Sequence, residues 1–80
     1  MAHSDTTEYN GKHYPSWHGS PFDRGTADSW YSRKASPHYY PEGTGNGEKI
    51  QPPRMNKNEV ASYIAGYEFN EAEGGKKDWQ

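Results

Sequence analysis

The 80-residue sequence contains no cysteine and no leucine, and its only valine or isoleucine residues are Ile50, Val60 and Ile64. The lack of cysteine excludes disulfide bonds and thiolate metal sites, and it fits a reducing compartment. No apolar run approaches the length of a membrane span, and the first residues lack the apolar segment of a signal peptide. We therefore expect a cytoplasmic protein that has no membrane partner.

Aromatic side chains are abundant where aliphatic ones are scarce. The chain has three Trp, seven Tyr and two Phe, which make up 15% of its residues, while its mean hydropathy is −1.41. Tyr and Trp can bury an apolar face and still expose a polar group. The sequence predicts one small domain with a thin, largely aromatic core made of Phe22, Trp30, Tyr31, Val60, Tyr63, Ile64 and Tyr67.

Residues 1–19 show neither helical nor strand periodicity, because polar residues, Gly and Pro interrupt every run. We predict a flexible N-terminal arm here. The arm carries His3, His13 and His18, but these lack the defined spacing and the additional ligand types of metal sites. No metal site is predicted.

Residues 20–36 are predicted to form a first helix. Ser20 is a preferred N-cap, Pro21 suits the first helical position, and Asp23 suits the positive end of the helix dipole. Pro37 disfavours helical geometry at the residue before it, so the helix should end by Ser36.

Residues 56–73 give the clearest helical signal. Asn56 and Glu59 have the spacing of a capping box. Apolar side chains follow at helical intervals at positions 60, 63, 64 and 67, and Gly74-Gly75 provides a stop. Residues 74–80 are read as a tail.

A long loop, residues 37–54, separates the two predicted helices and is rich in Pro and Gly. Loops of this length are usually functional or mobile. The predicted fold is a small all-α domain, residues 20–73, in which two helices form an antiparallel hairpin around an aromatic, Gly- and Pro-rich loop.

No constellation of catalytic residues is recognisable. The sequence has no Ser-His-Asp order and no paired-carboxylate motif, and the stretch GTGNG lacks both the preceding strand and the spacing of a dinucleotide-binding loop. We therefore predict that the protein is not an enzyme, binds no cofactor and has no small-molecule substrate.

Charge is unevenly distributed although the net charge is only −2. Residues 23–57 contain six basic and four acidic side chains, whereas residues 58–73 are acidic. Cations interleaved with aromatic rings are typical of contacts with single-stranded RNA, although the same aromatics could simply form the core. The predicted RNA- or partner-binding residues are Arg24, Trp30, Arg33, Lys34, His38, Tyr39, Tyr40, Lys49 and Arg54.

The order of short motifs resembles the ribosome modulation factor family over residues 20–73. The motifs are Arg24-Gly25, Ser36-Pro37-His38-Tyr39, and the run Tyr63–Glu68 followed by Glu71-Ala72. The resemblance implies a two-helix protein that binds the small ribosomal subunit near the 3′ end of its RNA and promotes inactive ribosome dimers. It also implies structural roles for Gly25 and Gly66, and RNA contact by Arg24 and Tyr39.

Two functions are therefore expected. The first is modulation of translation through the ribosome or its RNA. The alternative is an acidic protein–protein modulator, of the kind carried by phages or mobile elements, that binds and inhibits a host enzyme. The acidic second helix and the Tyr- and Trp-rich arm motivate this alternative, since both residue types anchor protein interfaces.

Overall fold

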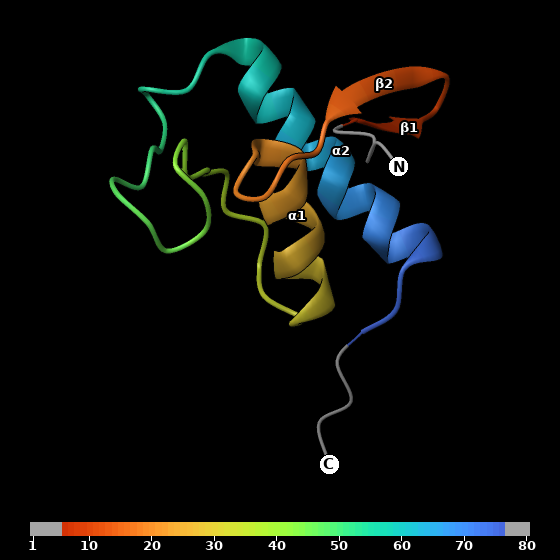
Figure 1. The fold of residues 1–80 in the computed structure, drawn as a ribbon. Helices are drawn as coiled ribbons and strands as arrows, with labels where there is room; N and C mark the ends of the chain where they lie inside the picture. Colours follow the sequence, from red (N-terminus) through yellow and green to blue (C-terminus); the bar gives the residue numbers. More distant parts are fainter. Residues whose placement is uncertain (1–5, 77–80) are drawn as a thin grey trace, which may run out of the picture.

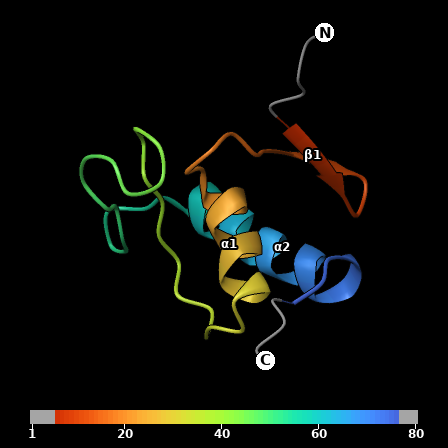
Figure 2. The same cartoon turned by 60° about the horizontal axis from the view of Figure 1, so that its bottom comes forward.

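A computed structural model describes residues 6–76 of the chain, which form a β-hairpin and two helices (Figures 1 and 2). The strands are β1, Thr6–Tyr9, and β2, Lys12–Pro15; the helices are α1, Pro21–Trp30, and α2, Lys57–Glu73. A connector, residues 31–56, joins the helices. Figure 2 shows the connector and the hairpin on opposite sides of the helix pair.

The β-hairpin replaces the predicted flexible arm. Its strands pair antiparallel around Asn10-Gly11, whose φ angles of 53° and 74° are both positive. Two successive positive φ angles are typical of the type I′ turn, for which Asn-Gly is the preferred sequence. The hairpin is tied to the helices by Tyr9, which packs against Phe69, and by Tyr14, which stacks on Phe22. The prediction is thus wrong for the described part of the arm; residues 1–5 lie outside the described residues.

Helix α1 begins as predicted but ends earlier. The Ser20 side chain accepts a hydrogen bond from the Asp23 amide, which caps the first turn. The helix closes after Trp30, where the Arg33 amide donates to the Asp28 carbonyl and Ser32 has a φ of 59°. This is the pattern of a C-terminal cap with a left-handed residue, a position that usually holds Gly. Because Ser32 occupies this position, the sequence lacks the glycine that usually indicates the end of a helix.

Helix α2 has the predicted ends. The Glu59 amide donates to the Asn56 side chain at 2.8 Å, and the Asn56 amide donates to the Glu59 carboxylate at 2.9 Å, which completes the capping box. The helix ends at Gly74. Of the described helices, neither combines the length and the apolar character that a membrane crossing requires.

The two helices meet at two glycines. A Cβ atom on Gly25 would lie under 3.0 Å from the Tyr63 carbonyl oxygen, and one on Gly66 would lie equally close to the Phe22 carbonyl oxygen. The backbones are therefore in direct contact, which only glycine permits. The structural roles expected for Gly25 and Gly66 agree with this geometry.

The helices run in broadly the same direction (Figure 1). Near the C-terminal end of both helices, the Ser29 hydroxyl donates to the Glu71 carboxylate at 2.6 Å. The predicted all-α antiparallel hairpin is therefore wrong, both because the chain contains a two-stranded sheet and because of the helix direction. Short turns produce antiparallel neighbours, whereas this connector is long enough to return the chain to the starting end.

The core is smaller than predicted and partly different in membership. Its buried hydrophobic residues are Phe22, Ile50, Met55, Tyr63 and Ala65. Trp30, Tyr31 and Ile64 were expected inside but are 41%, 36% and 37% exposed. The crossing at Gly66 turns the Tyr63 face of α2 inward, which leaves Ile64 facing outward. Ile50 and Met55 of the connector fill the remaining space.

Candidate nucleic-acid interface

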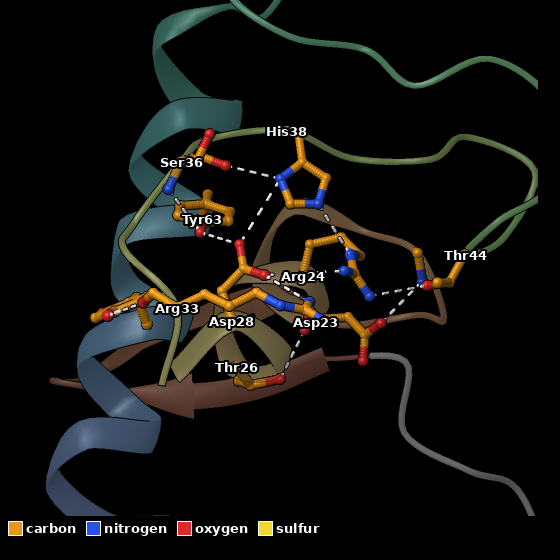
Figure 3. Close-up of polar contacts among 11 residues, drawn as sticks. Asp23, Arg24, Thr26, Asp28, Arg33, Ser36, His38, Thr44 and Tyr63 are labelled. Carbon is orange, nitrogen blue, oxygen red and sulfur yellow. Dashed lines mark hydrogen bonds and ion pairs between the residues drawn. The ribbon is translucent and has the colours of Figure 1, made fainter. Parts of the chain in front are cut away.

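A buried polar cluster lies between α1, α2 and the connector (Figure 3). At its centre is Asp28, which is only 3% exposed. The Tyr63 hydroxyl donates to its carboxylate, and the Arg33 guanidinium lies 3.3 Å from it. The same Tyr63 oxygen accepts a hydrogen bond from the Ser36 amide at 2.9 Å. The cluster thereby fixes the start of the connector against both helices.

His38 extends this cluster as a neutral side chain of defined tautomer. The Arg24 Nε–H donates to His38 Nε2 at 3.0 Å, so that nitrogen carries no proton. The other ring nitrogen, Nδ1, therefore carries the hydrogen and donates to the Ser36 carbonyl at 2.7 Å. Burial lowers the pKa of His38 below its ordinary value of 6.5, and the cations of Arg24 and Lys49 act in the same direction. The Ser36 hydrogen bond and Asp28 oppose this shift without reversing it.

Stability is expected to fall as the pH drops below about 6.5. The lowered pKa of His38 means that the unfolded chain binds a proton more readily than the folded one. This contribution is therefore complete above pH 6.5 and is lost as the pH falls through the folded-state value. Urea unfolding between pH 5 and 8 measures it. His38→Gln, which keeps an acceptor near Arg24, should flatten the pH dependence, whereas His13→Gln, at an exposed site, should leave it intact. An equal dependence in wild type and His38→Gln would contradict this prediction.

Tyr63→Phe is expected to lower the free energy of unfolding by about 2 kcal/mol. It removes the hydroxyl donor of one oxygen of the buried Asp28 carboxylate, and it leaves the Ser36 amide without its acceptor. Chemical denaturation measures the loss. Tyr67→Phe is the matched control, since its hydroxyl donates to the Arg33 carbonyl at an exposed site. The control should lose clearly less, and equal losses would argue against the buried cluster as a stabilising element.

Beside this cluster lies a hollow of about 320 Å³, here called the basic pocket. Its walls come from α1 and the connector and consist of Arg24, Asp28, Arg33, Lys34, Ser36, His38, Tyr40 and Lys49. Four of these side chains are cationic and one is anionic, which gives the pocket a charge of +3 with His38 neutral. The single carboxylate already interacts with Arg33 and Tyr63. The pocket therefore has positive charge available for an anion.

A local pairing in the connector brings these distant residues together. Tyr39 and Ile50 exchange two backbone hydrogen bonds, at 2.9 and 3.0 Å, in an isolated antiparallel bridge. Lys49 therefore lies opposite Tyr40 and joins residues that come from α1 and the first part of the connector. Within residues 6–76, neither Lys34 nor Lys49 forms an ion pair with a carboxylate. Both ammonium groups remain available.

Arg24 is the most enclosed cation of the pocket, with a side chain only 13% exposed. Its guanidinium contacts His38, lies 3.9 Å from Asp28 and lies over the Tyr40 ring at 5.7 Å. An arginine held on several sides presents its remaining N–H groups in a fixed direction, which suits the recognition of phosphate. Arg24 is thus oriented before any ligand binds.

Six of the nine predicted binding residues line the basic pocket: Arg24, Arg33, Lys34, His38, Tyr40 and Lys49. The other three lie elsewhere. Tyr39 faces a second pocket, where a hydrogen bond to Glu59 raises the pKa of its hydroxyl. Arg54 is paired with Glu48 at an exposed site, and Trp30 lies exposed near Gly75.

Sequence reasoning missed Asp28 and Tyr63 as the residues that hold the pocket wall. Asp28 lies three residues after Gly25, on the face of α1 that meets α2. An acidic residue on a packed helical face is a usable signal, since such a group is rarely buried without partners. Of the three His residues considered as metal ligands, His13 lines the second pocket, His18 is exposed and His3 lies outside the described residues. Nowhere in the described chain do three His, Asp or Glu side chains gather as a metal site.

The acidic residues of α2 and the aromatic residues of the N-terminal segment, which suggested a protein-binding surface, mostly make contacts within the chain. Glu59 serves the capping box, and Glu71 accepts from Ser29 and pairs with Lys76. The arm aromatics Tyr9 and Tyr14 pack against the helices. The acidic face of α2 is therefore reduced mainly to Glu68 and Glu73.

Comparison of the chain with protein-family models, with curated proteins and with solved structures gave no match. The functional argument therefore depends on the geometry of the pocket.

Proposed function

We propose that this chain is a non-enzymatic cytoplasmic protein that modulates translation by binding RNA of the small ribosomal subunit, with the basic pocket as its phosphate-binding surface. The observation that carries the proposal is the convergence of four cations on one hollow whose single carboxylate is already engaged. Cationic side chains supply most of the affinity of proteins for nucleic acids by neutralising phosphates.

The overall acidic charge focuses this interaction on one face. The chain carries −2 in total and the basic pocket carries +3, so the remaining residues carry −2 − 3 = −5. A polyanion is therefore attracted at the pocket and repelled elsewhere. Most of the surface therefore contributes little to RNA binding, and the RNA segment is held at one defined place, the basic pocket.

Affinity capture from a cell extract, with and without nuclease, tests the proposal against the rival protein partner. Small-subunit RNA should be recovered with the tagged protein, and nuclease treatment should abolish the recovery. Capture of a single host protein that survives nuclease, without ribosomal RNA, would refute RNA binding and favour the inhibitor of a host enzyme.

A further inference from the structure

A second hollow, of about 410 Å³, lies where β2, the connector and the first turns of α2 meet. Tyr14 from β2, Trp17 from the segment before α1, and Tyr39 from the connector contribute its aromatic walls. We call it the aromatic pocket. The aromatic pocket shares no lining residue with the basic pocket. Its function is therefore considered separately.

Trp17 is the ring that remains available in this pocket. Tyr14 already stacks on Phe22, with ring centroids 5.4 Å apart, and the Tyr39 hydroxyl interacts with Glu59, which raises the pKa of Tyr39. In the part of the chain that the structure describes, the Trp17 indole has no ring partner and its N–H has no acceptor, although the side chain is half-buried. A half-buried indole facing a hollow offers a flat surface for another ring to stack on.

Polar groups at the edge of the aromatic pocket could orient a ring that stacks on Trp17. Asn58 and Ser62 are one turn apart on α2, both line the hollow, and neither side chain has a hydrogen-bond partner among residues 6–76. Lys12 lies at the rim, 5.3 Å from the centroid of the Tyr14 ring. An aromatic wall, an amide and hydroxyl edge, and a cation at the rim match the ring, the hydrogen-bonding edge and the phosphate of a nucleotide.

The aromatic pocket and the basic pocket share one short segment of chain. Tyr39 and Tyr40 are consecutive at an extended bridge, and consecutive side chains in extended backbone point to opposite sides. Tyr39 lines the aromatic pocket and Tyr40 lines the basic pocket. An RNA strand that passes over Tyr39 and Tyr40 would therefore contact both pockets.

From these features we infer that the aromatic pocket binds an unpaired nucleobase, stacked on Trp17 and held at its edge by Asn58 and Ser62. The inference rests on the proposed function, because the base belongs to the strand whose phosphates the basic pocket holds. It adds that the RNA is single-stranded at this point, since a base within a duplex cannot enter a side pocket without leaving its stack.

Tryptophan fluorescence tests the site directly. The chain has three tryptophans, so Trp30→Phe with Trp79→Phe leaves Trp17 as the only reporter. This variant is titrated with a single-stranded oligoribonucleotide, with an abasic oligonucleotide of the same length, and with adenosine alone. The RNA and adenosine should both quench the emission, and the abasic ligand should bind about 5- to 150-fold more weakly than the RNA, the range expected for one stacked base.

Substitutions at the pocket give the second readout. Trp17→Ala should bring the affinity for RNA down to that for the abasic ligand, while Trp17→Phe restores most of it. Asn58→Ala, at an exposed site that should not affect folding, is expected to weaken the binding of RNA by about two- to tenfold and that of the abasic ligand not at all.

Equal affinity for RNA and the abasic ligand, unchanged by Trp17→Ala and Asn58→Ala, would overturn the nucleobase site and leave RNA binding by the basic pocket standing. Failure of both oligonucleotides to bind at low salt would overturn the proposed function and this inference together.

Discussion

Replacing Lys34 and Lys49 by Gln is expected to weaken the binding of single-stranded RNA by about 60-fold at 50 mM salt and by about tenfold at 200 mM salt. Each phosphate contact with a single strand contributes about 0.7 to the slope of log affinity against log salt, so two lost contacts lower the slope by about 1.4. The fold-changes follow if the electrostatic contribution vanishes near 1 M salt. These two lysines are chosen because neither has a carboxylate partner in the described chain.

Fluorescence anisotropy of a labelled oligoribonucleotide over a salt series measures both the affinity and the slope. The matched control is Arg54→Gln with Lys57→Gln, which removes the same amount of charge outside the basic pocket. The control should change the slope far less. If both double variants weaken RNA binding equally, the effect comes from the change in net charge. That result would contradict the basic pocket as the phosphate-binding surface.

Gly66→Ala is expected to lower the free energy of unfolding by about 3 kcal/mol or more. In an isolated helix the same change is favourable by about 1 kcal/mol, because alanine is the better helix former. Here, however, the new Cβ would lie under 3.0 Å from the Phe22 carbonyl oxygen. Both groups belong to helix backbones, so no change of rotamer relieves the clash, and α1 and α2 must separate. Overpacking of this kind costs about 1–3 kcal/mol or more, and the separation also loosens the core around Phe22 and Tyr63.

Thermal and urea unfolding followed by circular dichroism measure the loss. Gly45→Ala is the control, since nothing lies within 4 Å of its Cβ position but its φ is +79°. Left-handed backbone alone should cost it about 1 kcal/mol. A Gly66→Ala variant as stable as the wild type would contradict the direct contact of the two backbones.

The second helix could be predicted from the sequence because its signals are local. Asn56 and Glu59 cap it, its apolar positions follow the helical period, and Gly74 stops it. The β-hairpin has a local signal of the same kind, since Asn10-Gly11 favours a type I′ turn. The residues on either side lack strand periodicity, however, and on that ground the sequence predicts a flexible arm. The early end of α1 was not predictable on these rules, because Ser32 occupies the left-handed position where Gly is expected.

The site was predictable in membership but not in arrangement. Basic and aromatic residues between positions 24 and 49 stand out in composition, and six of those selected line one pocket. Their convergence depends on the bridge between Tyr39 and Ile50, which are 11 positions apart. No hydrophobic periodicity in the sequence predicts this pairing. The separation of Tyr39 from Tyr40, one on each pocket, follows from that same bridge.

The direction of the helices shows why the predicted antiparallel packing was wrong. Two amphipathic segments and a loop are compatible with parallel or antiparallel packing, and the choice depends on where the connector packs. Ile50 and Met55 are buried in the core, so the connector is fixed along the helix pair and returns the chain to its starting end. That information lies in tertiary contacts of the connector, which helical periodicity does not describe.

Sedimentation with purified small ribosomal subunits tests the central claim most directly. At low salt the wild-type protein should migrate with the subunits through a sucrose gradient, and Lys34→Gln with Lys49→Gln should leave most of the protein at the top. Arg54→Gln with Lys57→Gln should migrate like the wild type. Wild-type protein that stays at the top of the gradient at low salt would contradict the account.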